Sequence, residues 1–239
     1  MSPIRANLQQ ARHAIDAAIA GCAAPHRHGV TLVAVSKSQP PAAVRAAFDA
    51  GQRRFAENYA QEGVAKIAAL ADLAQQGLEW HFIGPLQSNK AGLVATHFDW
   101  VQSVDRLKIA QALSARRRGA PLNVLIEVNI SGEASKAGVA PGEALALAAQ
   151  VARLPQLRVR GLMAIIENVA DEAGQRRQFA ALRQLYEQGC AQGMAFDTLS
   201  MGMSGDFRVA IEEGATLVRL GTAIFGARAP KPTRTAEAA

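Results

Sequence analysis

Short apolar segments alternate with helix-like segments from about residue 30 to residue 226, and this alternation constrains the fold more than any other feature. The apolar segments are mostly apolar on both faces, which is typical of parallel strands covered by helices on both sides. Eight strand–helix units in about 200 residues predict a single closed α/β barrel, a (β/α)8 or TIM barrel. The predicted strands are 30–36, 53–58, 80–84, 99–103, 123–130, 158–165, 198–201 and 216–220.

The segments between these strands repeat apolar residues at three- and four-residue spacing, which predicts amphipathic helices. An extra helix over 3–22 is expected before the first strand, and an open doubly wound sheet is the alternative fold. No GxGxxG follows the first strand, which counts against a dinucleotide-binding sheet. The predicted helices are 41–51, 60–76, 88–96, 105–118, 141–153, 172–190, 206–213 and 222–226.

Composition supports one domain and excludes several classes of protein. Hydrophobic residues make up 49% of the 239 positions, enough for a single large core, so we expect a barrel over 1–228. The Pro/Lys/Thr/Ala-rich segment 229–239 is expected to be a disordered tail. No run of eighteen apolar residues and no apolar signal core is present, which predicts a cytoplasmic protein that does not bind membranes.

Charge and ligand spacing exclude two further kinds of site. The formal charge of +6 favours anionic partners, but the basic residues are scattered, so we do not expect nucleic-acid binding. Two cysteines and five histidines form no clustered ligand spacing, so no metal site is expected.

Lys37 is the one charged residue at the end of the first predicted strand, where Ser38, Gln39 and two prolines stop the strand. Active groups of a (β/α)8 barrel lie at the carboxyl ends of the strands, so we interpret Lys37 as a Schiff-base lysine. The alternative is a lysine whose stem merely covers apolar surface. A lysine with an ordinary pKa of about 10.4 must lose its proton to attack a carbonyl, through burial or a nearby cation. Arg219 is the candidate cation.

Two glycine–hydroxyl loops follow the seventh and eighth predicted strands, where this fold often binds phosphate. Ser204 and Gly205 lie in the first loop, and Gly221 and Thr222 begin the second. Glycine lets the backbone approach an anion, and first-turn amides and hydroxyls donate to it; ordinary helix capping is the alternative. A reactive lysine and a phosphate site at one barrel mouth together match one cofactor, pyridoxal 5′-phosphate (PLP).

Seven motifs in this order resemble the YggS/PROSC family of pyridoxal phosphate homeostasis proteins. They are AVSKSQP around Lys37, FAENYAQE at 55–62, HFIGPLQSNK at 81–90, NISGEASKAG at 129–138, GLMAI at 161–165, SMGMSGD at 200–206 and RLGTAIFGAR at 219–228. The resemblance implies a barrel similar to the N-terminal domain of alanine racemase.

The resemblance also assigns roles to individual residues of this chain. It implies that Lys37 is the Schiff-base lysine, that Asn58 lies near the cofactor ring, and that Arg219 lies near the pyridine nitrogen. It places the phosphate at Ser204–Gly205 and at Gly221–Thr222. The chain departs from the family pattern at Ala56, where a glycine is usual, and at Ile166, where a proline is frequent; Gly205 stands where relatives vary.

Arg219 favours a cofactor carrier over an enzyme. A guanidinium cannot accept a proton, so it leaves the pyridine nitrogen unprotonated and the ring a poor electron sink. Only about thirteen residues follow Gly226, so we expect no added domain to supply a second catalytic base, and we expect a monomer. PLP-dependent apoenzymes are the candidate recipients.

Two other functions stay open. One is a small PLP-dependent amino-acid racemase or lyase, for which Tyr59 is the first candidate base. The other is a nucleic-acid-binding or regulatory module, which only the net positive charge suggests.

Overall fold

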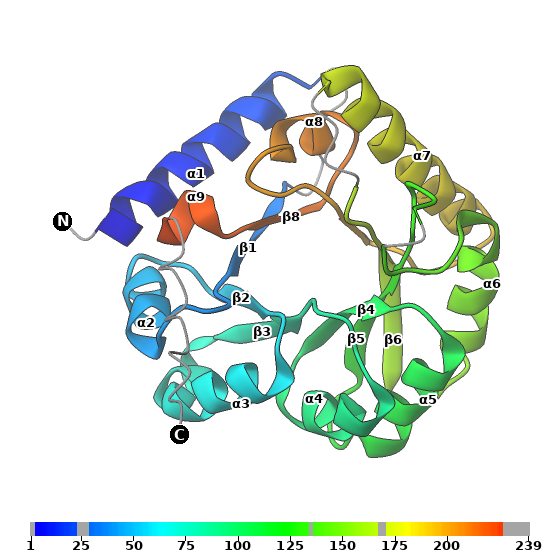
Figure 1. The fold of residues 1–239 in the computed structure, drawn as a ribbon, viewed down its shortest axis with the longest axis horizontal. Coiled ribbons are helices and arrows are strands. Elements are labelled where there is room, and N and C mark those ends of the chain that lie inside the picture. The colour runs from blue at the N-terminus through cyan, green and yellow to red at the C-terminus, as the bar shows by residue number, and fades with distance from the viewer. Residues whose placement is uncertain (1–2, 23–28, 134–135, 167–170, 227–239) are drawn as a thin grey trace, which may run out of the picture.

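The computed structural model describes residues 3–22, 29–133, 136–166 and 171–226. Eight parallel strands form a closed barrel in sequence order, and β8 pairs with β1 to complete it (Figure 1). The predicted (β/α)8 barrel is confirmed, and the open-sheet alternative is wrong. The strands are β1 Thr31–Val35, β2 Arg54–Glu57, β3 Glu79–Phe82, β4 Trp100–Val104, β5 Leu122–Glu127, β6 Leu157–Met163, β7 Thr198–Ser200 and β8 Leu217–Leu220.

Helices form the outer ring, and most of them match the predicted segments. They are α1 Pro3–Ala20, α2 Pro41–Asp49, α3 Ala60–Ala69, α4 Ala91–His97, α5 Leu107–Arg116, α6 Pro141–Val151, α7 Glu172–Ala191, α8 Phe207–Glu212 and α9 Thr222–Phe225, with 3-10 turns η1 Ala71–Gln76 and η2 Ser88–Lys90. The predicted helix 60–76 is α3 followed by η1, because Leu70 leaves helical geometry at φ −120° and ψ 22°. Leu70 and Leu73 are both buried, and their spacing of three suits a 3-10 turn.

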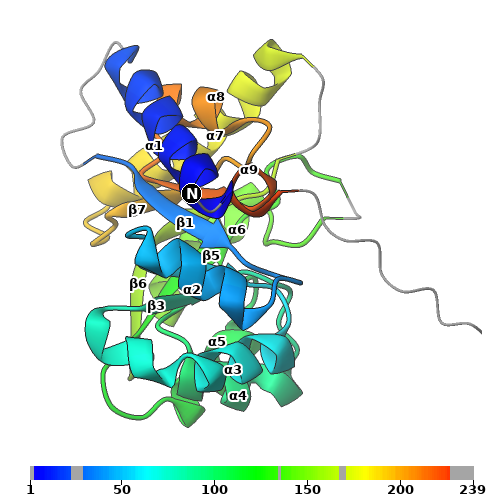
Figure 2. The same ribbon diagram turned by 90° about the vertical axis from the view of Figure 1, so that its left-hand side faces the viewer.

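The extra N-terminal helix lies where the first and last helices of the outer ring meet. α1 packs against α8 and α9 and also against α2 (Figures 1 and 2). Its buried residues are Leu8, Ala11 and Ile15, which recur at three- and four-residue spacing. The first and last elements of the barrel are therefore held together by one apolar helix face.

Side chains alternate along each strand between the outer core and the barrel interior. Outward residues such as Phe55 and Phe82 belong to the large core under the helices, whereas Val33, Ala56 and Ile83 form a small separate cluster. The interior also holds polar side chains, since Arg219 is only 2% exposed and is hydrogen-bonded to the buried Ser200. The barrel interior therefore holds a buried charge as well as apolar packing.

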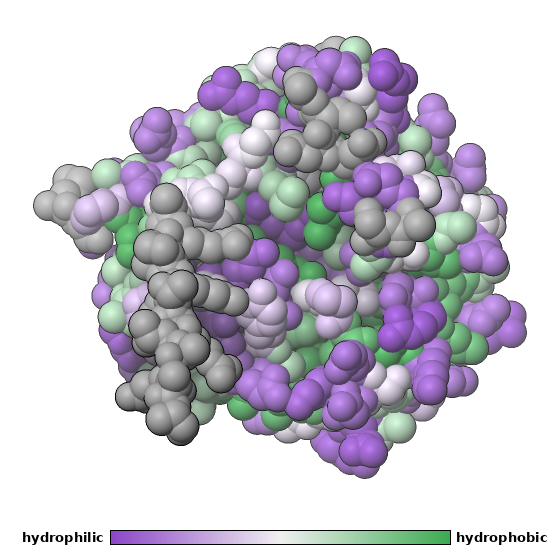
Figure 3. Space-filling view, viewed as in Figure 1, coloured by the Kyte–Doolittle hydropathy of each residue, from purple (hydrophilic) through white to green (hydrophobic). Residues whose placement is uncertain are grey.

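Figure 3 shows the face seen in Figure 1, where hydrophilic side chains make up much of the lower rim, over α3 to α5. Within the described residues, no helix is both long and apolar enough to cross a membrane. The predicted boundary between residues 228 and 229, and the predicted tail 229–239, lie outside the described residues.

Candidate functional site at the carboxyl mouth of the barrel

Lys37 lies in the turn that directly follows β1, and its side chain is half-buried. The same small pocket is lined by Lys37, Gly221 and Thr222, together with neighbouring residues of both segments. Pairing of β1 with β8 brings the two segments together, because Ala34 is the register partner of Leu220. The structure therefore places the predicted lysine beside one of the two predicted phosphate loops.

Ser38, the residue after Lys37, has a left-handed backbone with φ 62°. Only glycine adopts this conformation without steric cost, so the turn has to be held by its surroundings. Glu62 in α3 holds it, because its Oε1 accepts a hydrogen bond of 2.6 Å from the Ser38 amide. The direction in which the chain leaves Lys37 is thus fixed by a carboxylate.

A buried lysine ties this carboxylate to the end of β1. Lys66 Nζ donates to Glu62 Oε1 at 2.7 Å, to Glu57 Oε1 at 2.8 Å and to the carbonyl oxygen of Ser36 at 2.6 Å. The Ser36 hydroxyl also donates to Glu57 Oε1, at 2.6 Å. We call Ser36, Glu57, Glu62 and Lys66 the lysine brace, since they fix the backbone on both sides of Lys37.

Within the lysine brace, the charge of the buried Glu57 carboxylate is only partly compensated. Burial raises the pKa of the Glu57 carboxyl, and hydrogen bonds from Lys66 and Ser36 offset that rise only in part. Glu57 Oε2 is buried with no hydrogen-bond partner. Sequence reasoning missed this network, although Glu62 and Lys66 stand four residues apart in a predicted helix, which is ion-pair spacing.

Arg219 lies in β8, two residues before Gly221, and its side chain is buried inside the barrel. Its Nη1 donates to Ser200 Oγ at 2.6 Å, and its Nη2 donates to the carbonyl oxygen of Ala164 at 2.9 Å. Burial lowers the pKa of Arg219 to about 10, and the nearby carboxyls of Asp206 and Glu127 act against that fall. The guanidinium is therefore still a cation at neutral pH.

The loop after β7 holds Ser204 and Gly205 next to the Arg219 strand. The Arg219 amide donates to the carbonyl oxygen of Gly202 at 3.0 Å, which links this loop to β8. Asp206 shapes the loop by accepting a hydrogen bond of 2.5 Å from the Met203 amide. A Cβ at Gly205 would meet nothing within 4 Å, so this backbone is open to an approaching group.

Asn58 follows β2 and is half-buried, with its Oδ1 buried and without a hydrogen-bond partner. Buried amide oxygens are normally paired, so this atom is an acceptor available to a bound molecule. A Cβ on Gly84 would lie 2.0 Å from the Asn58 carbonyl oxygen, so only glycine fits there. The glycine of the HFIGPLQSNK motif therefore holds the segment after β2 close to the segment after β3.

Glu127 ends β5 at the same mouth and was not predicted. Burial raises its pKa to about 7, with a further rise from Asp105 and an opposing effect of Arg219. It is thus a titratable group near neutral pH beside the predicted site. Glu127 is the one charged residue of the predicted strand 123–130, and this was the available signal.

The predicted cofactor residues come from adjacent strand ends around one arc of the mouth. One pocket is lined by Lys37, Gly221 and Thr222. The backbone amide of Arg219 is hydrogen-bonded to the loop that carries Ser204 and Gly205. Asn58 lies after β2, which pairs with β1. A half-buried amine, an unpaired amide oxygen, an open glycine and a buried cation fit a molecule with an aldehyde, a phosphate and a ring. Within the residues that the structure describes, no three His, Cys, Asp or Glu side chains gather as a metal site.

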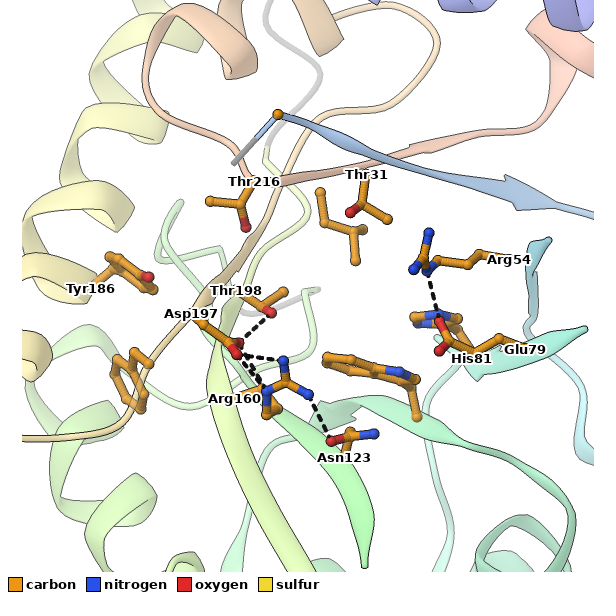
Figure 4. A pocket seen from close by; sticks show the side chains of 14 residues that line it. Thr31, Arg54, Glu79, His81, Asn123, Arg160, Tyr186, Asp197, Thr198 and Thr216 are labelled. Atoms are coloured by element: carbon orange, nitrogen blue, oxygen red, sulfur yellow. Dashed lines mark hydrogen bonds and ion pairs between the residues drawn. The ribbon is translucent and has the colours of Figure 1, made fainter. Parts of the chain in front are cut away.

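A larger pocket lies elsewhere, at the amino end of the barrel (Figure 4). Its volume is about 700 Å³, and no sequence pattern predicted it. Arg54 pairs with Glu79 on one side and Arg160 with Asp197 on the other. The charges in this pocket are therefore already compensated by one another.

The protein is thus a (β/α)8 barrel with a half-buried lysine directly after its first strand. The family model described as "Alanine racemase, N-terminal domain" matches residues 4–229. The pyridoxal phosphate homeostasis protein of Vibrio cholerae is 52% identical over 231 residues, which are 95% of this chain and 98% of the relative. The chain belongs to the alanine racemase N-terminal domain family and, within it, to the pyridoxal phosphate homeostasis proteins.

Two solved structures are similar to this chain at different levels. PipY of Synechococcus elongatus, solved with PLP bound, has a TM-score of 0.80 and 37% identity, covering 93% of this chain and 100% of PipY. Alanine racemase of Corynebacterium glutamicum has a TM-score of 0.68 and 16% identity, covering 96% of this chain and 62% of the racemase. The second similarity shows the shared fold alone.

Proposed function

We propose that this protein binds PLP at the carboxyl mouth and holds it as a Schiff base on Lys37, for storage, buffering or delivery of the cofactor. The observation that carries the proposal is the pocket that Lys37 shares with Gly221 and Thr222. The name of the Vibrio cholerae relative and the PLP bound in PipY support it. Little or no catalytic turnover is part of the proposal.

Each predicted residue has a separate task in this proposal. Lys37 Nζ bonds to the aldehyde carbon, the carbonyl oxygen leaves as water, and hydrolysis reverses the attachment. Backbone amides and hydroxyls at Ser204–Gly205 and Gly221–Thr222 bind the phosphate oxygens. The unpaired Oδ1 of Asn58 accepts a hydrogen bond from the ring's substituents.

Arg219 is the support for low turnover. When bound to an enzyme, PLP supplies an electron sink that depends on a protonated pyridine nitrogen. Arg219 donates hydrogen bonds from both Nη atoms, stays cationic and cannot take up a proton. A ring nitrogen beside it stays unprotonated, which favours holding the cofactor over reacting with it.

The binding test is reduction of the loaded protein with borohydride, followed by peptide mass spectrometry. We expect the cofactor mass on the peptide that contains Lys37, and loss of the visible Schiff-base absorbance in Lys37→Ala. Lys136→Ala is the matched control, since Lys136 is a half-buried lysine of the β5–α6 loop at the same end of the barrel. Retention of the absorbance in Lys37→Ala would show that a different lysine anchors the cofactor.

Delivery is tested by mixing loaded protein with a PLP-dependent apoenzyme and comparing its reactivation with that by free PLP at matched concentration. Faster or fuller reactivation by the loaded protein supports delivery, and reactivation limited by release of free PLP supports storage or buffering. On this proposal the protein acts in the cytoplasm as a monomer, and light scattering of the eluted protein measures the second point.

Glu127 favours a second candidate function, a racemase or lyase acting on an amino acid. With a pKa of about 7, this carboxyl is able to give and take a proton at neutral pH. Tyr59, the first candidate base from the sequence, is 56% exposed. Exchange of the α-proton of amino acids into D2O, lost in Glu127→Gln, is the result that supports an enzyme over a carrier.

A further inference from the structure

Five polar side chains form an unbroken hydrogen-bonded chain through the interior of the barrel. Arg219 Nη1 lies 2.6 Å from Ser200 Oγ, which lies 2.7 Å from Gln102 Oε1. Gln102 Nε2 lies 2.9 Å from His81 Nδ1, and His81 Nε2 lies 2.9 Å from Glu79 Oε1. We call these residues the axial chain; it begins at the cofactor mouth and ends in the pocket at the amino end of the barrel.

The axial chain has one consistent direction. A carboxylate only accepts, so His81 Nε2 carries the hydrogen and His81 Nδ1 accepts from the Gln102 amide. The Gln102 oxygen then accepts from the Ser200 hydroxyl, which accepts from Arg219. In every hydrogen bond of the axial chain, the donor is on the Arg219 side and the acceptor is on the Glu79 side. Each bond therefore polarises the next.

Protonation states agree with that direction. Burial lowers the pKa of His81, and hydrogen bonding and charge attraction from Glu79 offset this only in part, so the imidazole is neutral at neutral pH. Burial acts to raise the pKa of Glu79, but its hydrogen bond with His81 and the charge of Arg54 outweigh burial and lower it. The chain thus runs from a buried cation to an ionised carboxylate.

Burial makes each link depend on its neighbours. Ser200, Gln102 and His81 have no exposed surface. Leaving a buried donor or acceptor without its partner costs about 1–3 kcal/mol, so none of these side chains turns away without loss. Ser200 and the Ala164 carbonyl are the two acceptors of the Arg219 Nη atoms, and the axial chain fixes the first of them.

Glu79 is the solvent-reachable end of the axial chain. Its side chain is 32% exposed, it accepts a hydrogen bond of 3.0 Å from Arg54 Nε, and both residues line the pocket of Figure 4. A change of charge at Glu79 therefore alters the terminal acceptor of a chain whose other end is Arg219.

We propose that His81 and Gln102 are positioning residues for Arg219, and that the carboxylate of Glu79 acts on the cofactor mouth from the opposite end of the barrel through them. The effect on PLP rests on the proposed function, in which Arg219 faces the pyridine nitrogen. The orientation of Arg219 in the cofactor-free protein does not rest on it.

The matched variants are Glu79→Gln and Asp197→Asn. Both remove one negative charge from the same pocket, and both carboxylates are paired with an arginine there. Only Glu79 belongs to the axial chain. A general effect of pocket charge or of folding changes both variants alike, whereas coupling through the axial chain changes only Glu79→Gln.

Nitrogen-15 NMR of the cofactor-free protein is the first measurement. In Glu79→Gln we expect shifts of the His81 ring nitrogens and of the Arg219 Nε–H resonance, and in Asp197→Asn we expect neither. The rate of PLP release from the loaded protein is the second, with an increase of about fivefold expected in Glu79→Gln only, since a charge-assisted hydrogen bond becomes a neutral one.

Gln102→Glu separates positioning from simple filling of space. The carboxylate still accepts from Ser200 but cannot donate, so His81 Nδ1 has to take up a proton, visible as imidazolium nitrogen shifts at neutral pH. Gln102→Leu cuts the axial chain outright, and we expect PLP release about tenfold faster or more. If Gln102→Leu does not fold, Glu79→Gln still tests the proposal, because Glu79 is partly exposed and its substitution should leave the fold intact.

The results separate the two proposals. Identical NMR spectra around Arg219 and identical release rates in Glu79→Gln and Asp197→Asn overturn the axial coupling. NMR shifts in Glu79→Gln together with no PLP binding by the unmodified protein support the positioning and overturn the proposed function. PLP binding with an unchanged release rate in Glu79→Gln supports the function and overturns the effect on the mouth.

Discussion

The two ends of the barrel differ in how their charges are balanced. At the amino end, Arg54 and Arg160 each pair with a carboxylate inside a pocket of about 700 Å³. At the carboxyl end, Arg219 makes no ion pair with any described residue, and Glu127 has a pKa raised to about 7. The Oδ1 of Asn58 adds a buried acceptor without a partner.

The candidate site lies at the smaller of the two pockets, so pocket size alone does not mark it. The larger pocket has complementary charges that satisfy one another, as expected of the end of a barrel that serves stability. At the carboxyl end, Lys37 lines the smaller pocket, Arg219 is buried close enough to Asp206 and Glu127 to feel their charge, and the Oδ1 of Asn58 has no hydrogen-bond partner among the described residues. Three experiments test this contrast, and each pairs a residue at the carboxyl end with a counterpart at the amino end.

The largest expected effect is that of Lys66→Met in the lysine brace. Removing this buried cation leaves Glu57 uncompensated and should lower the free energy of unfolding by about 3–5 kcal/mol at pH 7. Arg54→Met at the amino end breaks a largely exposed pair and should cost below about 1 kcal/mol. Urea unfolding of both cofactor-free variants measures the difference.

The same experiment at pH 5 checks the cause. Burial already raises the pKa of Glu57, and loss of Lys66 raises it further, so Glu57 binds a proton and the loss in Lys66→Met becomes smaller. A loss that is independent of pH, or equal to that of Arg54→Met, would contradict the account of the brace.

Glu127→Gln and Glu79→Gln should change stability in opposite directions. The ordinary pKa of Glu127 is 4.5 and rises to about 7 in the fold, so the unfolded chain loses its proton first. Stability therefore falls as pH rises from about 4.5 through about 7, by on the order of 3 kcal/mol. Glu127→Gln removes this loss: it should equal the unmodified protein at pH 4 and exceed it at pH 8.

Glu79 has a lowered pKa, so it contributes stability above its ordinary pKa of 4.5, and that contribution is lost as pH falls through the lowered value. Glu79→Gln should therefore be less stable than the unmodified protein at pH 8 and equal to it at low pH. Chemical unfolding from pH 3 to pH 8 measures both curves. Curves of the same sign for the two variants would break the contrast between the ends.

The smallest expected effect concerns two exposed residues with left-handed backbones, Ser38 after β1 and Gln156 before β6, at φ 62° and 63°. Glycine relieves the strain at both, so Ser38→Gly and Gln156→Gly should each raise the free energy of unfolding by about 0.5–1 kcal/mol. Only Ser38→Gly should weaken PLP binding, because it loosens the turn that holds Lys37. Equal PLP affinity in the two variants would show that this turn does not orient the lysine.

Local pattern was enough to predict the barrel and the arc of strand ends that carries the candidate site. Strand length, apolar runs and the positions of glycine and proline depend on neighbours in sequence, so the eight units and the place of Lys37 after the first strand were visible. Helix 60–76 was predicted as one element and is two, because the burial of Leu70 and Leu73 is decided by packing against the barrel. The proposed roles of Asn58 and Arg219 at the cofactor came from family resemblance rather than from pattern.

The sequence by itself determined the order of the elements and which residues stand at the carboxyl ends of the strands. Only the tertiary structure decided what the interior of the barrel holds. Ser200 and Gln102 are 98 positions apart yet hydrogen-bonded, and no periodicity records a contact across a barrel axis. The raised pKa of Glu127 and the pairing of Glu79 with His81 arise in the same way, because burial and charge depend on which distant strands closure of the barrel brings together.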